Sequence, residues 1–453
     1  INTCSKFIVI FIIFGAFLER TGISDFFIDF ANALVGGFSG GPAKVAVVSS
    51  ALLGMVSGSS VANTVGSGSV TIPMMKKTGY RGEFAGAVEA AASTGGQIMP
   101  PIMGAAAFLM ADIVNVPYSN IIVRAIIPAV LYFTGIFIAV HVEAKKNKLE
   151  GIPKDQLPKM SVLAKEIYLL LPIIMLIYLV STATKTIQTA AALSIVAAIV
   201  VSLPNKAHRM NLKSVFEALA SGGKGAISVA AACGIAGIIA GTITMTGLAN
   251  VLINGIVAIA GNQVIIALFL TMICCIVLGM GVPTTANYCI MAATCAPILV
   301  RMGVPMLAAH FFVFYFGIVA DITPPVALAA YAGAAIAKSD PMKTAVNATK
   351  LAIAAFIVPY ILAMNPAMIF IDVTGPLQIV SIAVTSLVGI FGVSTGVAGF
   401  MFAKMNPLQR ILSICGGLAL MYPGSASDII GVAIVGAVIV WQLALNKKAA
   451  AAA

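Results

Sequence analysis

Two short polar stretches interrupt apolar runs of this chain, and their side chains are of the kind that bind small hard cations. The first is Ser57-Gly58-Ser59-Ser60-Val61-Ala62-Asn63-Thr64, and the second is Gly281-Val282-Pro283-Thr284-Thr285-Ala286-Asn287. Hydroxyl, amide and carbonyl oxygens are the ligands that such cations prefer, while the free N–H groups of a helix that begins near Ser60 or Thr285 attract a carboxylate. The stretches therefore predict binding of a cation such as Na⁺ and of an organic anion.

A second pair of segments carries double prolines, which interrupt a helix and free backbone carbonyls. These segments are Gly95-Gly96-Gln97-Ile98-Met99-Pro100-Pro101 and Asp321-Ile322-Thr323-Pro324-Pro325. Asp321 is an acid inside an apolar run, a functional position by default in a membrane, and could be a cation ligand or a proton carrier. Its counterpart Gln97 is neutral, so we expect two cation sites that differ. Glu89 is either a buried polar contact or packs against a lumen.

The four segments belong to an internal repeat. Asn63 and Asn287 are 224 residues apart (287 − 63), and the same offset relates Pro73 to Pro297, Gly79 to Gly303 and Pro100-Pro101 to Pro324-Pro325. Small polar residues often only pack helices closely, but a fixed offset favours function. With four spans between the copies, at 121–141, 167–182, 187–203 and 225–245, the copies are expected to be inverted, as in many transporters.

Each copy has the same order of elements. An apolar arm (43–56 or 264–279) leads to the polar stretch, a return arm follows (ending near 73–77, or 288–299), and then comes the helix broken by the double proline. The arms are shorter than the roughly 20 residues that cross a bilayer. We therefore predict two re-entrant helical hairpins whose tips lie at mid-membrane beside two broken helices, facing something polar because exposed backbone is costly there.

Composition places these elements in a membrane. Of 453 residues, 60% are apolar and 9% charged, with mean hydropathy +1.07, which excludes an ordinary soluble domain. The 42 glycines and 21 prolines favour packed, broken helices over a β-barrel, so the fold class is an all-α polytopic membrane protein. The net charge of +11 comes from short loops and indicates a positive-inside topology, not nucleic-acid binding.

Catalysis finds little support in the residue types. The seven cysteines include no C-x-x-C pair and the three histidines have no ligand spacing, which favours packing over redox or metal chemistry. A channel or an intramembrane enzyme would need a continuous polar pore or a catalytic group, and the sequence contains no Ser/Lys or Ser/His pair at a suitable spacing and no G-x-S-x-G. We therefore expect no enzyme and no catalytic residue.

Five units follow from this pattern. They are a scaffold helix with a connector (1–42), the first transport unit (43–120), scaffold helices with a charged connector and the lead-in to the second copy (121–262), the second transport unit (263–340) and C-terminal membrane helices (341–453). Because the chain opens at Ile1 without a methionine, we expect a fragment or a processed product.

The motifs at 58–63, 90–104 and 320–326 resemble the large membrane subunit of a TRAP transporter, of the TAXI type in which the large and small membrane subunits are often fused. The resemblance extends from about 14 to 365. It implies an inverted-repeat, elevator-type secondary transporter of the inner membrane. A Na⁺ gradient would drive this transporter, with Na⁺ as the coupling ion. It also implies a periplasmic or tethered substrate-binding protein that delivers an organic acid, and a small membrane subunit, fused or separate.

The residues and the resemblance together give a set of candidate sites. The predicted Na⁺ ligands are Ser57, Ser59, Asn63, Gly95, Gln97, Pro100, Pro283, Thr284, Asn287, Asp321 and Thr323. The predicted substrate-binding residues are Ser60, Thr64, Thr285 and Gly96. The predicted function is Na⁺-coupled import of a small carboxylate. The alternative is a symporter of the same architecture that uses protons or needs no binding protein.

Overall fold

The computed structural model describes residues 4–182, 184–205 and 207–451, so residues 1–3 of the predicted first unit lie outside it. The described chain is helical, as predicted, and forms no β-strand beyond one isolated bridge between Phe400 and Lys404. It begins with η1 (Cys4–Ile8), α1 (Val9–Glu19) and α2 (Ile23–Val35).

The two copies of the repeat appear as two matching sets of helices. The first set is α3 (Gly41–Ser57), α4 (Ser60–Lys77), α5 (Gly82–Gly96) and α6 (Gly104–Val114). The second is α13 (Val264–Gly279), α14 (Thr284–Thr294), α15 (Ala296–Arg301), α16 (Met306–Val319) and α17 (Leu328–Ala337). The first residues of α4, α5 and α6 lie 224 positions before those of α14, α16 and α17. The predicted hairpins and broken helices are therefore present.

Glycines and caps set the hairpin tips. In the first hairpin, Gly58 is left-handed (φ +60°) and the Ser59 hydroxyl caps α4 by accepting from the Ala62 N–H. A Cβ on Gly58 would lie 2.6 Å from the Gly104 Cα, so this close approach also needs glycine. The second return arm, predicted at 288–299, starts earlier and is divided between α14 and α15. Pro297 accounts for the division because it lacks an N–H and crowds the preceding turn.

The helices between the copies follow the predicted spans closely. They are α7 (Tyr118–Lys146), η2 (Lys154–Gln156), α8 (Met160–Leu163), η3 (Ile167–Leu170), α9 (Leu171–Ser181), α10 (Ile187–Ser202), α11 (Leu212–Met245) and α12 (Leu248–Ala260). The prediction of a helix start near 225 was wrong, because α11 begins after Asn211, whose side chain caps it. Helix α11 continues through its glycines, and Gly222 packs directly on Ile13 of α1.

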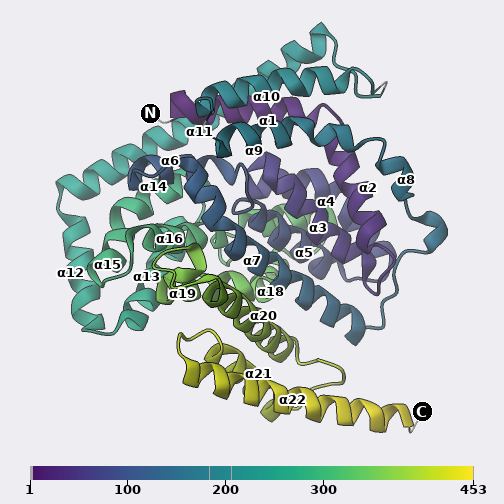
Figure 1. Cartoon of the computed structure of the whole chain (residues 1–453), viewed down its shortest axis with the longest axis vertical. Helices are drawn as coiled ribbons and strands as arrows, with labels where there is room; N and C mark the ends of the chain where they lie inside the picture. The colour runs from purple at the N-terminus through teal and green to yellow at the C-terminus, as the bar shows by residue number, and fades with distance from the viewer. Residues whose placement is uncertain (1–3, 183, 206, 452–453) are drawn as a thin grey trace.

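In Figure 1, α3, α4 and α5 of the first repeat lie near the middle of the view, and α13, α14, α15 and α16 of the second repeat lie on the left. Helices α1, α9, α10 and α11 lie along one side, and α17 packs on both α4 and α5, so the two repeats contact each other directly. The C-terminal part consists of α18 (Pro341–Leu351), α19 (Ile353–Met364), η4 (Pro366–Ile369), α20 (Pro376–Ala398), α21 (Pro407–Ala419) and α22 (Ser425–Ala451). Of these, α20 packs on α7, and α21 and α22 lie outside it.

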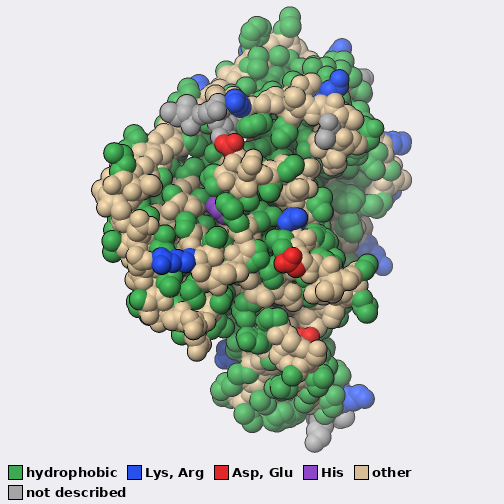
Figure 2. All heavy atoms as spheres, turned by 60° about the vertical axis from the view of Figure 1, so that its left-hand side comes forward, with side chains coloured by type: hydrophobic (Ala, Val, Ile, Leu, Met, Phe, Trp, Pro, Cys, Tyr) green, Lys and Arg blue, Asp and Glu red, His purple; other side chains and the backbone are tan. Residues whose placement is uncertain are grey.

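The outer faces are apolar, as a lipid environment requires. Among the described residues, four helices are long and apolar enough to cross a membrane, and up to seven spans result if each bent helix pair counts as one. Figure 2 shows a face covered mainly by hydrophobic side chains with few charges between them. Met245 at the end of α11 is 91% exposed, and Ile238 on the same helix is 70% exposed. The chain is a multi-pass membrane protein.

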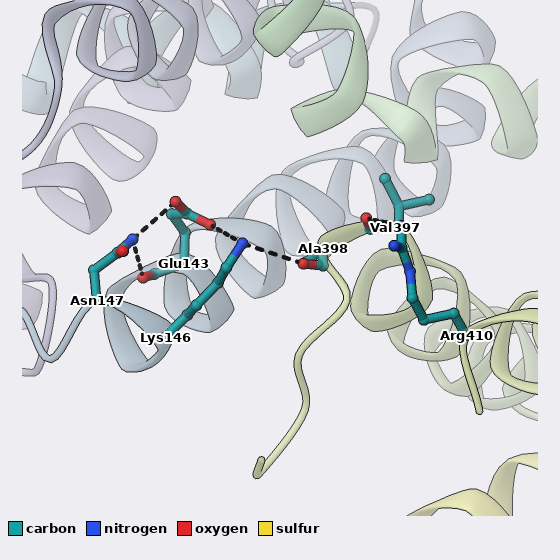
Figure 3. Close-up of polar contacts among 6 residues, drawn as sticks. All are labelled: Glu143, Lys146, Asn147, Val397, Ala398 and Arg410. Atoms are coloured by element: carbon teal, nitrogen blue, oxygen red, sulfur yellow. Dashed lines mark hydrogen bonds and ion pairs between the residues drawn. The ribbon is translucent and has the colours of Figure 1, made fainter. Parts of the chain in front are cut away.

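Basic side chains join α20 to α7 and α21 to α20. The Lys146 ammonium donates to the Ala398 carbonyl (3.4 Å), and Arg410 donates to the Val397 carbonyl (3.1 Å), as Figure 3 shows. Arg410 also donates to the Gly396 carbonyl (2.9 Å). These carbonyls belong to the last turn of α20, which has no intrahelical donors for them. Cations are favourable at this negative end of the helix dipole.

We expect Arg410→Gln to loosen the junction between α20 and α21. A hydrogen bond from a charged group contributes about 1.5–3 kcal/mol when shielded and less when exposed, so we expect a loss of about 1 kcal/mol and roughly fivefold faster amide exchange in the last turn of α20. Hydrogen exchange with mass spectrometry measures this. Lys404→Gln, an exposed neighbour, is the control, and equal exchange in the two variants would contradict the prediction.

Candidate functional site

The Asp321 carboxylate joins both hairpin tips to both helix breaks. Its Oδ2 accepts from the Ser60 hydroxyl (2.6 Å), the Gln97 amide (3.3 Å) and the Thr284 hydroxyl (3.5 Å). Asp321 is 7% exposed. Ser60 begins α4, Thr284 begins α14, and Gln97 and Asp321 follow α5 and α16. A buried carboxylate needs such donors, and here it draws them from three separate elements.

The four residues are two repeat-related pairs. Gln97 and Asp321 are 224 positions apart, and so are Ser60 and Thr284. The repeat therefore brings equivalent positions to one point between the two copies. The difference between Gln97 and Asp321 gives this point a donor on one side and an acceptor on the other. Three of these residues were predicted as Na⁺ ligands and Ser60 as a substrate contact, and all four lie together.

Four buried oxygens near the tips and breaks accept no hydrogen bond. They are Ser57 Oγ, Thr94 Oγ1, Gln97 Oε1 and Asn287 Oδ1. Buried polar atoms usually have a partner, so these oxygens are available to coordinate one. Oxygens of hydroxyl and amide groups suit a hard cation, and these residues therefore fit Na⁺. Thr94 was not among the predicted ligands.

The two repeat asparagines are oriented by their amide nitrogens. Asn63 Nδ2 donates to the Ser50 carbonyl of α3 (3.0 Å), and Asn287 Nδ2 donates to the Gly317 carbonyl of α16 (3.0 Å). Both side chains are buried. Because each nitrogen is occupied by a carbonyl, each amide oxygen points away from it. Asn287 Oδ1 is the unpaired acceptor described above.

The remaining predicted residues take ordinary structural roles. Gly95 packs against the Tyr132 ring, and Gly96 packs against Gly54. Pro100 and Pro101 share a cis peptide bond, and Pro283 precedes α14. Thr285 is buried, and the hydroxyls of Thr64 and Thr323 donate to the carbonyls four residues earlier. Their backbone carbonyls are still near the tips. Their assignment to cation or substrate remains a prediction.

Cavities lie on both sides of the first tip. One of about 390 Å³ is lined by the tip 57–59 together with α1 and α11. Another of about 580 Å³ lies between α4 and the α1–α2 region. Val56, Ser57 and Glu19 line both cavities. Their volumes are in the range of small-molecule sites, so the tip borders spaces large enough for a small organic acid.

A further polar cluster was not predicted. Glu89 is fully buried and accepts hydrogen bonds from the hydroxyls of Ser50, Ser67, Thr71 and Ser93. Of the two alternatives for Glu89, a buried polar contact is the one observed. The signal in the sequence was Asn63, Ser67 and Thr71 at intervals of four, which places them on one face of α4.

Comparisons with known proteins identify the family of the chain. The model of the family "Tripartite ATP-independent periplasmic transporter, DctM component" matches residues 1–377. A C4-dicarboxylate TRAP transporter large permease protein from Pseudomonas aeruginosa is 31% identical over 147 residues, 32% of this chain and 34% of the relative. A putative TRAP transporter large permease protein from Haemophilus influenzae is 26% identical over 378 residues, 80% of this chain and 88% of the relative.

A sialic acid TRAP transporter permease protein, also from Haemophilus influenzae, is 28% identical over 144 residues. That match covers 32% of this chain and 23% of the relative. This chain thus matches about a third or less of the length of the dicarboxylate and sialic acid relatives.

We expect Gly96→Ala to destabilise the protein by about 1–3 kcal/mol, because overpacking a tight contact costs that much. A Cβ on Gly96 would lie 2.6 Å from the Gly54 Cα and 3.2 Å from the Asn63 amide nitrogen. Gly66→Ala is the matched control, since nothing lies within 4 Å of a Cβ there. Thermal unfolding followed by circular dichroism tests this, and equal unfolding temperatures for the two variants would contradict it.

Proposed function

The chain belongs to the DctM component family of tripartite ATP-independent periplasmic transporters, and from this premise we propose that it imports a small organic acid through the inner membrane, coupled to Na⁺. The family consists of membrane transporters and not of enzymes. The observation that carries the proposal is the set of unpaired buried oxygens beside the Asp321 junction. Their chemistry is that of a hard-cation site built from discontinuous helices.

The substrate class follows from the tip and its cavities. Relatives are named for C4-dicarboxylates and sialic acid, both of which carry carboxylates. In this chain the first turn of α4 offers free N–H groups and the positive end of the helix dipole beside the cavity that the 57–59 tip lines. We place the substrate carboxylate there, near Ser60, Thr64 and Gly96, with Thr285 as the counterpart at the second tip.

Transport is proposed to follow the elevator scheme. The two hairpins with α5, α6, α16 and α17 would move as one transport domain, which is the unit that the Asp321 junction connects. We propose that a soluble or tethered substrate-binding protein supplies the acid. A small membrane subunit, fused to this chain as in the TAXI type or separate, would complete the transporter.

We expect Na⁺ to raise the unfolding temperature of the purified protein relative to K⁺ at equal ionic strength. A ligand that binds only the folded state stabilises it by about 2.7 kcal/mol at one hundred times its Kd. Asn63→Ala and Asn287→Ala should each reduce the Na⁺ effect strongly. Asn120→Ala, an exposed residue of α7, should leave it unchanged. An equal effect of Na⁺ in all variants would contradict the assignment.

We expect an inward Na⁺ gradient to drive uptake of labelled succinate into proteoliposomes that contain the chain and its partners. Uptake should need both the gradient and the binding protein, and Asn287→Ala should lower it at least tenfold at low Na⁺. Uptake that is unaffected by replacing Na⁺ with K⁺ would reject Na⁺ coupling. Uptake without the binding protein would favour direct capture of the substrate from solution.

A further inference from the structure

Glu89 has an unusual environment for a carboxyl group. It lies inside the first repeat with 0% exposure, and hydroxyls from three helices surround it: Ser50 on α3, Ser67 and Thr71 on α4, and Ser93 on α5. Ser50 Oγ lies 2.6 Å and Ser93 Oγ 3.2 Å from Oε1, Ser67 also contacts Oε1, and Thr71 contacts Oε2. No charged side chain of the described residues interacts with Glu89.

Several charged and titratable groups on neighbouring helices are engaged elsewhere. Lys44 contacts His141, and His310 contacts Tyr288. Lys76, Tyr132 and Tyr331 donate to the carbonyls of Ala337, Ala91 and Pro325, respectively. Lys343 and Lys350 of α18 line a surface cavity with Glu83 and Glu143. An ionised Glu89 would therefore be a buried charge without a counterion, which strongly favours the neutral acid.

The hydroxyls can satisfy Glu89 in both protonation states. Ser67 has a second acceptor in the Asn63 carbonyl (2.7 Å), and Thr71 has one in the Ser67 carbonyl (3.1 Å). When Glu89 is ionised, both hydroxyls donate to it. When Oε1 carries a proton, this O–H donates to Ser67 Oγ, and the Ser67 hydrogen turns to the Asn63 carbonyl. Rotation of hydroxyls alone thus accommodates gain or loss of the proton.

The second repeat lacks this cluster. The positions 224 residues after Ser50, Ser67, Thr71, Glu89 and Ser93 are Cys274, Met291, Cys295, Val313 and Gly317. The same helical frame therefore forms with an apolar core in its place. The first repeat therefore carries a polar cluster that the shared helical frame does not itself require.

The cluster lies directly behind the wall of a cavity. Ser67 is one of the residues that line the cavity of about 580 Å³ between α4 and the α1–α2 region, and Asn63 and Ser57 line it too. A water molecule in that cavity is one hydroxyl away from Glu89. Na⁺ fits the cluster less well, since the hydroxyls contact the carboxylate directly and leave no gap for a cation among the oxygens.

We propose that Glu89 and the hydroxyls of Ser50, Ser67, Thr71 and Ser93 form a proton-binding site of the first repeat, which exchanges one proton with water in the α1–α2 cavity during transport. A hydronium ion in the cavity gives its proton to Ser67 Oγ while the Ser67 hydrogen passes to Glu89 Oε1, which leaves a water molecule, and release of the proton reverses these two transfers. The role of this site in coupling rests on the proposed transport function. The protonation of Glu89 does not depend on that function.

Infrared spectroscopy of the purified full chain in lipid tests the protonation. At neutral pH we expect a carboxylic acid C=O band that disappears in Glu89→Gln and persists in Glu83→Gln, a matched carboxyl on the same helix. Thr71→Val, which keeps Glu89, should shift the frequency of the band, and this variant serves if Glu89→Gln does not fold. A wild-type spectrum without the band, or a band that all three variants leave unchanged, overturns the proposal. Na⁺ bound to an ionised Glu89 would give a wild-type spectrum without this band.

Transport of labelled succinate in proteoliposomes tests the coupling. At a constant Na⁺ gradient, an inward proton gradient should raise the initial rate several-fold in the wild type and in Glu83→Gln, and should leave Glu89→Gln unaffected. A Glu89→Gln variant that still responds to the proton gradient overturns the proposal. Absence of Na⁺-driven uptake in every protein would reject the proposed function instead, and the infrared result would stand by itself.

Discussion

The burial of one carboxylate, that of Asp321, constrains the centre of this protein. An ionisable group in an apolar interior is tolerated only with donors around it, and Asp321 takes its donors from both hairpins and from the opposite helix break. A displacement of either hairpin relative to the other would remove one of its three donors. The junction therefore favours one relative position of the two repeats, and with it the placement of the candidate cation ligands.

The sequence predicted much of this arrangement because the repeat is visible in residues that end or break helices. Prolines, glycines and asparagines at a fixed offset located the tips and the breaks, and α4, α5 and α6 begin at positions matched by α14, α16 and α17. What escaped prediction depends on long-range packing. The contact between Gly54 and Gly96, and the direction in which the Asn287 amide oxygen points, arise only when separate helices meet.

Local rules also failed where tertiary contacts overrode them. The span predicted at 225–245 starts earlier, because Asn211 caps α11, and Gly222 lies inside this helix, where Ile13 packs against it. Glu89 was left undecided because its partners come from three helices, and no single stretch of sequence reports such a convergence. Spacing by four along α4 showed that polar residues share a face, but not what that face contacts.

The two repeats therefore share a frame and differ in chemistry. Symmetry accounts for the hairpins, the double prolines and the paired asparagines, whereas each of the two buried acids has a non-acidic counterpart: Gln97 for Asp321 and Val313 for Glu89. A transporter whose two halves were chemically identical would bind its ions in equivalent ways at both tips. One acid in each repeat, one at the junction and one behind a cavity wall, makes the two halves chemically distinct, so the surroundings of the two tips are not equivalent.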